Sequence, residues 1–374
     1  MLYGYTINTD TMLNNKSIAV VVPAYNEEKQ IGLVLESMPD FVDRIIVVND
    51  CSKDNTFEVS KTYIKKLGQK ELTPTPTNNG NVFYNKANDI IAQWNREEIK
   101  YFTSFEIYHH NLSDRIVILN LSKNSGVGSA ISIGYKWAKD NDIDCTAVMA
   151  GDGQMDPEEL QSICLPVVFE DIDYVKGNRL SHKSAKALIP KRRFLGNSIL
   201  SILTKIASGY WHISDTQTGY TAISNKALNK LDLYKIYPRY GMPNDMLVKL
   251  NIEDCSLKEV DIKPIYFIGE QSKMKIYKVI PKISWLLMRS FFKRIWKKYL
   301  FKSFHPLFIL YHLGLSLLCI SIPFGIKILT KVFTHTDANP VTVLAFALFF
   351  ISGFQSLVFA MWMDIQDNAR LYKD

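Results

Sequence analysis

The sequence has few cysteines, and they form no pattern. Its 374 residues include five cysteines, an odd number, and no two of them stand as CxxC. A disulfide framework needs paired cysteines at short spacings, and a structural zinc site needs Cys or His pairs with metal-ligand spacing. Because neither pattern occurs, the sequence argues against a disulfide-stapled or zinc-finger protein. It favours a reducing compartment.

Two other features are missing from the ends of the chain. The N-terminus lacks the basic and apolar regions of a signal peptide. Near the C-terminus, residues 271–302 contain ten Lys or Arg and no Asp or Glu, although the net charge of the whole chain is only +7. A basic block mixed with Trp, Phe and Leu is typical of a helix that lies on anionic headgroups. We expect a bilayer as partner there and no nucleic acid, because apolar segments follow at once.

Charge of either sign is absent from two long segments after this block. Residues 303–325 and 338–363 contain no Asp, Glu, Lys or Arg. At about 1.5 Å per residue, each is long enough as a helix to cross roughly 30 Å of hydrocarbon. The alternative, two buried helices of a soluble domain, would leave a polar face that neither segment has. Since Lys and Arg favour the cytoplasmic side, we expect a multi-pass protein of the plasma or inner cell membrane with residues 1–302 and 364–374 in the cytoplasm.

Apolar strands alternate with helices through the N-terminal part of the chain. Four segments read as a short apolar strand, a polar loop and a helix: SIAVVVPAYNEEKQIGLVLESM, VDRIIVVNDCSKDNTFEV, DRIVILNLSKNSGVGSAISIGYKWAKD and CTAVMAGDGQMDPEELQSI. This alternation predicts an α/β protein with a mostly parallel sheet flanked by helices. Ligands of such sheets bind outside the carboxyl ends of the strands. Those ends are polar or glycine-rich here, at residues 23–28, 49–52, 122–128 and 150–156.

The chain therefore divides into three predicted parts. Residues 1–270 form the α/β domain, with an insertion at about 68–113 that holds one helix near 89–101. Residues 271–302 form a basic amphipathic juxtamembrane segment. Residues 303–374 form a two-helix transmembrane anchor with a short tail.

Six motifs in order carry a resemblance to a known family. VPAYNEE, VNDCSKDNT, KNSGVGSAI, GDGQMDPEE, GNRL and DTQTGY have the order and spacing of family 2 glycosyltransferases of the GT-A fold, over about residues 17–270. The resemblance is closest to the dolichyl-phosphate mannose synthase-like branch, which loads a sugar onto a polyprenyl phosphate and includes membrane-anchored members. It implies an inverting, metal-dependent hexosyltransferase that uses a nucleotide-diphosphate sugar and a dolichyl or undecaprenyl phosphate, for glycan or cell-envelope assembly.

The GDGQ loop is the candidate metal site. Relatives have D-x-D-x-Q here, so Asp152 and Gln154 match the second Asp and the Gln, while Ala150 replaces the first Asp. Mg²⁺ or Mn²⁺ stabilises a departing pyrophosphate. It needs only one or two protein oxygens when substrate phosphates supply others. An ordinary helix start explains residues 156–159 without a metal, but it does not explain Asp152 or Gln154.

The resemblance also assigns residues to the two substrates. Pro23, Tyr25 and Glu27 belong to its nucleotide-sugar pocket, where Asp152 also acts, and Asp50 matches the aspartate that contacts the base. A structural alternative for Asp50 is capping of the turn after its strand. The acceptor and its phosphate are assigned to a second group of residues: Arg179, Arg192, Arg193, Asp215, Gln217 and Thr218.

The role of Asp245 depends on the acceptor. It stands where the family has its catalytic acid pair, and a hydroxyl acceptor would require a base there. A phosphate acceptor is already anionic, so Asp245 would then only orient groups. Together with Asp152 and Arg179, it completes the predicted catalytic set.

Two other functions compete with this prediction. One is a membrane-bound transferase to a sugar or lipid hydroxyl in polysaccharide synthesis, although the Q-x-x-R-W motif of processive synthases is absent. The other is a non-catalytic membrane scaffold with a degenerate fold. The replacement of the first motif Asp by Ala150 suggests this function, and the presence of the other motif residues argues against it: Asp50, Asp152, Gln154 and Arg179.

Overall fold

The computed structural model describes residues 15–72, 86–109, 111, 113–184, 191–265 and 276–373, without the side chains of residues 88, 191–197 and 276–279. The strands of the described part are β1 (Ile18–Ala24), β2 (Arg44–Asn49), β3 (Phe105–Tyr108), β4 (Ile116–Leu121), β5 (Cys145–Val148), β6 (Tyr174–Asn178), β7 (Thr221–Ser224), β8 (Leu257–Asp261) and β9 (Tyr372–Lys373). They form one sheet in the order β3-β4-β2-β1-β5-β7-β6-β8-β9.

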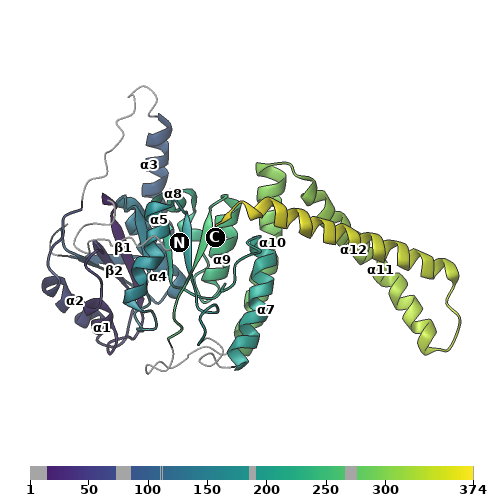
Figure 1. Cartoon of the computed structure of the whole chain (residues 1–374), viewed down its shortest axis with the longest axis horizontal. Helices are drawn as coiled ribbons and strands as arrows, with labels where there is room; N and C mark the ends of the chain where they lie inside the picture. Colours follow the sequence, from purple (N-terminus) through teal and green to yellow (C-terminus); the bar gives the residue numbers. More distant parts are fainter. Residues whose placement is uncertain are drawn as a thin grey trace, which may run out of the picture.

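Helices cover the sheet and continue beyond it (Figure 1). Those of the α/β domain are α1 (Ile31–Glu36), α2 (Thr56–Lys66), α3 (Lys86–Glu98), α4 (Val127–Asp140), α5 (Leu160–Phe169), α7 (Lys191–Ser208), α8 (Asn225–Lys230) and α9 (Met242–Ile252). Short 3₁₀ turns are η3 (Ile99–Tyr101), η4 (Pro157–Glu159) and η5 (Leu233–Lys235). The C-terminal part holds α10 (Ile276–Trp296), the π-helix η6 (Lys297–Lys302), α11 (Pro306–Phe333) and α12 (Pro340–Ala369).

The centre of the sheet is parallel, as the alternating pattern predicts. β2 and β5 both pair in parallel with β1, and β4 pairs in parallel with β2. Their residues are almost all buried because helices cover both faces. α1, α2 and α5 pack on one face, and α4, α8 and α9 pack on the other. The predicted mostly parallel, helix-flanked sheet is confirmed. β3 and β7 are its antiparallel strands.

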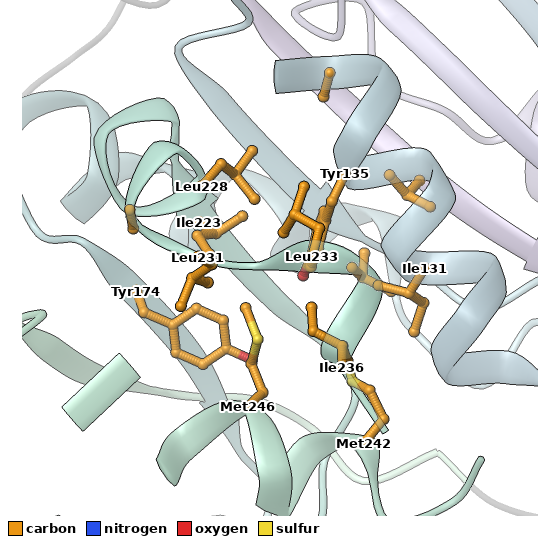
Figure 2. Close-up of a cluster of buried hydrophobic side chains, with 14 of the residues drawn as sticks. Ile131, Tyr135, Tyr174, Ile223, Leu228, Leu231, Leu233, Ile236, Met242 and Met246 are labelled. Carbon is orange, nitrogen blue, oxygen red and sulfur yellow. The ribbon is translucent and has the colours of Figure 1, made fainter. Parts of the chain in front are cut away.

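The core on the second face fixes the relative position of α4 and α9. Ile131 and Tyr135 of α4, Met242 and Met246 of α9, and Tyr174 of β6 point into one buried cluster (Figure 2). Removing each such side chain from water contributes about 1.5–3 kcal/mol. The N-terminal ends of both helices are thereby held at the same edge of the sheet, beside the carboxyl ends of the central strands.

Two long helices extend away from the sheet (Figure 1). α11 and α12 pack against each other, and each is long and apolar enough to cross a membrane. The uncharged segment 303–325 proves shorter than its helix, because α11 continues to Phe333 and carries Lys327 and Lys331 in its last turns. The connection between the helices is correspondingly reduced to residues 334–339.

Two features of the sheet edges were not foreseen. The insertion contributes β3, an antiparallel edge strand beside β4, as well as the expected helix, which runs as α3 over Lys86–Glu98. At the opposite edge, the chain returns from α12 and adds β9 in parallel to β8. The C-terminal tail is therefore part of the same sheet as the predicted site.

Candidate active site

The polar loops that follow the central strands lie together at one edge of the sheet. The strand register places Ala24 beside Asn49, and Asn49 beside Asn120, so β1, β2 and β4 end at the same level. The Asn49 side-chain amide donates to the Asn120 amide oxygen at 2.7 Å. β5 ends beside β1, where Val148 pairs with Val21. The candidate residues after these four strands are thus neighbours in space.

The predicted nucleotide residues lie at the end of β1 (Pro23) and in the loop after it (Tyr25 and Glu27), and all three are partly exposed. The Glu27 backbone N–H donates to Thr56 Oγ1 at 2.8 Å, which ties this loop to the start of α2. The Pro23 carbonyl accepts from the Gly151 N–H at 3.3 Å. This contact joins the predicted nucleotide loop to the GDGQ loop. The individual nucleotide contacts of Pro23, Tyr25 and Glu27 stay predictions.

Asp50 organises the loop that follows β4. Its carboxylate is buried and accepts from the backbone N–H groups of Ser125 at 2.6 Å and Gly126 at 2.8 Å. Burial raises the pKa of Asp50, and the two N–H groups oppose part of that increase. The carboxylate thus has a structural role, but in the loop after β4 and not in the turn after its own strand, where the capping alternative placed it. Its contact with a nucleotide base stays a prediction.

Glycine is required where the β4–α4 loop meets the segment before α9. Gly126 has φ +92°, and a Cβ at this position would lie 2.5 Å from the Pro238 carbonyl oxygen. The Gly128 N–H donates to the same oxygen at 2.9 Å. The G-x-G of the sequence thus lets the segment around Pro238 lie directly on the first turn of α4.

The GDGQ loop folds back on itself. The Asp152 carboxylate accepts from the Gln154 N–H at 3.1 Å, and Gly153 between them has φ +74°. The Asp156 side chain caps the following turn through the Glu158 N–H, as the ordinary helix start predicts. Asp152 and Gln154 are partly exposed and precede this cap, so capping does not account for them.

The metal prediction can be tested against this donor set. Among the described residues, no group of three or more His, Cys, Asp and Glu side chains could hold a metal ion by itself. One carboxylate and one amide oxygen, on a partly exposed loop, nevertheless fit Mg²⁺ or Mn²⁺ when phosphate oxygens and water complete the shell. Asp152 and Gln154 therefore fit an ion that arrives with a nucleotide diphosphate.

Arg179 forms a bidentate pair with Asp215. Arg179 Nε donates to Asp215 Oδ2 at 2.8 Å, and Nη2 donates to Oδ1 at 3.1 Å. Burial alone would raise the pKa of Asp215, but the charge and hydrogen bonds of Arg179 hold it below its usual value. Asp215 also accepts from the backbone N–H groups of Gln217 and Thr218. The structure thus brings these four predicted acceptor residues together, while their contacts with an acceptor stay predictions.

Arg192 and Arg193 belong to the first turn of α7. Their side chains lie outside the described part of the structure. The prediction that they bind phosphate is therefore neither supported nor opposed by a contact.

The side chain of Asp245 is already engaged within α9. Its carboxylate accepts from the Tyr237 N–H at 2.8 Å and is ion-paired with Lys249 one turn later. The preceding residue, Asn244, faces the DTQTG loop instead. Asn244 Oδ1 accepts from Gln217 Nε2 and from Thr204 Oγ1 of α7, both at 2.8 Å.

A pocket of about 150 Å³ lies where α4, α9 and the DTQTG loop meet. Its lining includes Val127 and Ile131 of α4, Gln217 of the loop, and Tyr240 and Met242 at the start of α9. Its lining is mostly apolar, with the Gln217 amide among its few polar groups.

Two cations at the site were missed by sequence reasoning. Lys176 of β6 is fully buried and donates to the Thr218 carbonyl, and burial lowers its pKa to about 8. Arg239 lies beside Gly126, and its charge acts on Asp50. A lysine inside a strand that ends in the GNRL motif was an available signal for the first. No sequence motif marks Arg239, because only the packing of its segment on α4 brings it close to Asp50.

Comparison with known proteins adds an independent finding. The profile described as Glycosyl transferase family 2 matches residues 19–82 and 104–232, just over half of the chain. A UDP-N-acetylglucosamine–dolichyl-phosphate N-acetylglucosaminyltransferase of Methanococcus voltae is 28% identical over 253 residues, which cover 67% of this chain and 87% of the relative. A dolichyl-phosphate beta-glucosyltransferase of Trichomonas vaginalis is 26% identical over 274 residues, which cover 68% of this chain and 65% of the relative.

Solved structures also resemble this chain. Glucosyl-3-phosphoglycerate synthase from Mycobacterium tuberculosis, in complex with Mn²⁺, uridine diphosphate and glucosyl-3-phosphoglycerate, is 15% identical. The similarity covers 79% of this chain and 86% of that one, with a TM-score of 0.48.

Proposed function

This chain belongs to glycosyl transferase family 2 and has its GT-A fold, and we propose that it transfers a hexose or N-acetylhexosamine from a nucleotide-diphosphate sugar to a polyprenyl phosphate. The product serves glycan or cell-envelope assembly. Two relatives that match about two thirds of the chain carry names with dolichyl phosphate as acceptor, which supports this acceptor class.

On the donor side, the loops after β1, β2, β4 and β5 hold the nucleotide sugar. Asp50 keeps the Ser125–Gly126 backbone in place, so the nucleotide meets a preformed wall. Asp152 and Gln154 are the residues that would hold Mg²⁺ or Mn²⁺. The bound ion would offset the negative charge that develops on the leaving pyrophosphate. The pocket beside Gln217 receives the sugar ring.

On the acceptor side, the observation that carries the proposal is the Arg179–Asp215 pair. The bidentate pair fixes the plane of the Arg179 guanidinium beside Asp215, the first residue of the DTQTG loop, and the Arg179 side chain remains 24% exposed. A planar guanidinium fixed in this way is suited to receive a phosphate, because it donates parallel hydrogen bonds to two oxygens.

The state of Asp245 supports a phosphate acceptor over a hydroxyl acceptor. A hydroxyl needs a base to remove its proton, whereas a phosphate monoester is already ionised at neutral pH. Asp245 is held by Lys249 and the Tyr237 N–H, and Asn244, which cannot act as a base, faces the loop. The site is therefore better suited to orient an anionic nucleophile than to generate one.

The reaction then follows in one displacement. An oxygen of the polyprenyl phosphate attacks the anomeric carbon and forms the new C–O bond, while the bond from that carbon to the β-phosphate oxygen breaks. The nucleotide diphosphate leaves with the bonding electrons, and the configuration at the anomeric carbon is inverted. Arg179 orients the attacking phosphate, and the loop from Asp215 to Thr218 positions the sugar beside it.

The membrane completes the proposal. α11 and α12 span the bilayer as an anchor, α10 lies at its surface, and the α/β domain faces the cytoplasm. The exposed basic residues of α10 and η6, among them Lys282, Arg289, Lys293 and Lys297, attract anionic headgroups, at roughly 1 kcal/mol per Lys or Arg. The polyprenyl tail stays in the bilayer while its phosphate reaches Arg179.

The test is a transfer assay with a panel of radiolabelled nucleotide sugars. Purified protein in vesicles is supplied with undecaprenyl or dolichyl phosphate, or with the same alcohols lacking phosphate, and lipid-linked product is extracted. We expect one sugar nucleotide to label the phosphates and none to label the alcohols. Equal labelling of alcohols would refute the phosphate acceptor, and labelling of a sugar or polyol would favour the hydroxyl transferase.

A further inference from the structure

A buried ion pair joins the end of the second long helix to the α/β domain. Arg294 of α10 and Asp364 of α12 are both fully buried. Arg294 Nη1 donates to Asp364 Oδ1 at 2.7 Å and Nη2 to Oδ2 at 2.8 Å. The same guanidinium donates to the carbonyls of Ala207 at 2.9 Å and Ile206 at 3.1 Å, at the end of α7. One side chain thus bonds three helices.

A second layer of polar contacts surrounds this pair. The Tyr299 hydroxyl donates to Asp364 Oδ1 at 3.0 Å and accepts from Asn368 Nδ2 at 2.8 Å. Lys298 Nζ donates to Asn368 Oδ1 at 2.9 Å and to the Asn251 carbonyl of α9 at 3.2 Å. We call the side chains of Arg294, Lys298, Tyr299, Asp364 and Asn368 the anchor lock. Buried polar groups that satisfy one another in this way are costly to separate, because a shift would leave buried charges unpaired.

The backbone continues the attachment past the anchor lock. Three residues after Asn368, the Leu371 carbonyl accepts from the Leu257 N–H at 2.7 Å. β9 then pairs with β8, with Tyr372 opposite Leu257. The last described residues of the chain are therefore fixed to the sheet, and α12 is held to the α/β domain at its end by side chains and backbone together.

The anchor lock bonds α7 through the Ala207 carbonyl and α9 through the Asn251 carbonyl. These two helices also hold the DTQTG loop. Thr204 of α7 donates to Asn244 of α9, which in turn accepts from Gln217 of the DTQTG loop. Ser201 of α7 contacts Thr216 of that loop at 2.9 Å. A short, buried path of contacts therefore runs from the end of α12 to the proposed acceptor site.

We propose that the anchor lock is a positioning device that sets the height and tilt of the acceptor site over the bilayer. This inference rests on the proposed function, since it assigns α11–α12 to the membrane and the acceptor phosphate to the headgroup layer. A polyprenyl phosphate cannot leave the bilayer, so the site must be held where the phosphate is. Transfer needs the reacting atoms within about 3–3.5 Å, and a misplacement near 1 Å costs roughly 100-fold in rate.

The variant that opens the lock is Arg294→Met combined with Asp364→Leu. Removing both charges avoids a buried unpaired ion, and apolar replacement of a buried pair commonly keeps the fold. The matched control is Lys226→Ala, which removes an exposed ion pair with Asp171 away from the lock and leaves the lock intact. Neither change touches the residues proposed to bind the donor or the phosphate.

Two readouts separate positioning from general damage. The first is kcat/KM for a long polyprenyl phosphate in vesicles, compared with a two-isoprene phosphate that is free in solution, with the KM for the donor measured in parallel. The second is the distance distribution between two spin labels, measured in nanodiscs. The labels are attached to a ketone-bearing amino acid that replaces Asn229 of α8 and Gln355 of α12, whose side chains are exposed on the surface of the protein.

For the double variant we expect a loss of roughly 10- to 100-fold with the long acceptor, a change below about twofold with the short one, and a broadened label distance. The control should change none of these. An equal loss with both acceptors, or an unchanged long-chain rate, would overturn the proposal. If the parent protein uses neither phosphate, the proposed function has failed, and a label distance that stays narrow in the double variant would show that the lock does not hold the anchor either.

Discussion

Replacing Arg179 with lysine separates phosphate recognition from maintenance of the fold. In the structure, Arg179 donates through Nε and Nη2 to the two carboxylate oxygens of Asp215. Lysine keeps a positive charge beside this buried carboxylate, but it cannot donate two parallel hydrogen bonds. The domain should therefore fold, while an incoming phosphate meets a flexible ammonium in place of a fixed plane. Arg179→Ala removes the charge as well.

The expected magnitude is that of losing a charge contact between Arg179 and the acceptor phosphate. Truncating one member of a close, desolvated charge pair costs about 2–5 kcal/mol of binding energy, which is roughly 30- to 4000-fold in rate if the contact is made in the transition state. The Arg179 side chain is 24% exposed and that of Asp215 only 3%. We place Arg179→Lys near the lower limit, because the charge remains. Arg179→Ala belongs near the upper limit, because it removes both the charge and the hydrogen-bond donors offered to the phosphate, and its melting temperature must be measured in parallel because Asp215 then stays buried without its counterion.

The assay measures kcat/KM for polyprenyl phosphate at saturating donor, together with donor affinity by calorimetry. We expect both Arg179 variants to lose transfer while donor affinity changes far less, since the proposed nucleotide contacts lie on the loops after β1, β2, β4 and β5 and only the sugar ring is placed beside the DTQTG loop. Lys226→Ala, which breaks an exposed pair with Asp171, is the matched control and should leave both quantities unchanged. Asp245→Asn should be milder than Arg179→Ala. If Asp245→Asn is the more damaging change, the acceptor is a hydroxyl and the reasoning fails.

Three further predictions concern the metal, the topology and a buried lysine. Asp152→Asn should abolish metal-dependent transfer with an unchanged melting temperature, and full activity of the parent protein in excess EDTA would contradict the metal site. A cysteine at Thr334 should react with an impermeant thiol reagent from outside intact cells, and one at Asn229 should not; the reverse pattern would invert the topology. Burial lowers the pKa of Lys176 to about 8 from 10.5, so its charge opposes folding below about pH 8 and the penalty disappears as pH rises to 10.5. Between these values the parent protein should gain up to about 3 kcal/mol of unfolding free energy relative to Lys176→Met, and parallel pH profiles in denaturant titrations would exclude a buried charge.

The strand-end loops could be predicted because their information is local. Each short apolar run identifies a buried strand, and the parallel order of β4, β2, β1 and β5 brings the following loops to one edge. Pro23, Asp50 and Asp152 could thus be placed together from periodicity and motif alone. The hydrogen-bond partners of the loop side chains were harder to predict from the sequence. Asp50 binds the Ser125 and Gly126 N–H groups, a choice that depends on a loop 75 residues away in the chain.

The anchor attachment could not be predicted, because its signals are weak in sequence. Arg294 and Asp364 are separated by 70 residues, and each stands in a segment where one charge has an ordinary explanation. Arg294 is one of ten cations in residues 271–302, which suggested only an attraction to headgroups. β9 is two residues long and carries no strand periodicity, so only pairing with β8 makes it a strand.

The acceptor site shows why a motif at the right position still leaves its mechanism open. Successive residues of an α-helix point about 100° apart, so Asn244 and Asp245 cannot both face the DTQTG loop. The sequence singled out Asp245, and the structure directs Asn244 to Gln217 while Lys249 engages Asp245. A protonated nucleophile would need this carboxylate as its base, although Tyr237 and Lys249 already engage its Oδ2 and its neighbour Asn244 is the residue that contacts the loop. An acceptor that arrives ionised needs no base, and the fixed guanidinium of Arg179 is already in place. The geometry around α9 therefore makes the charge of the acceptor, rather than a base on the enzyme, the simplest source of the nucleophile.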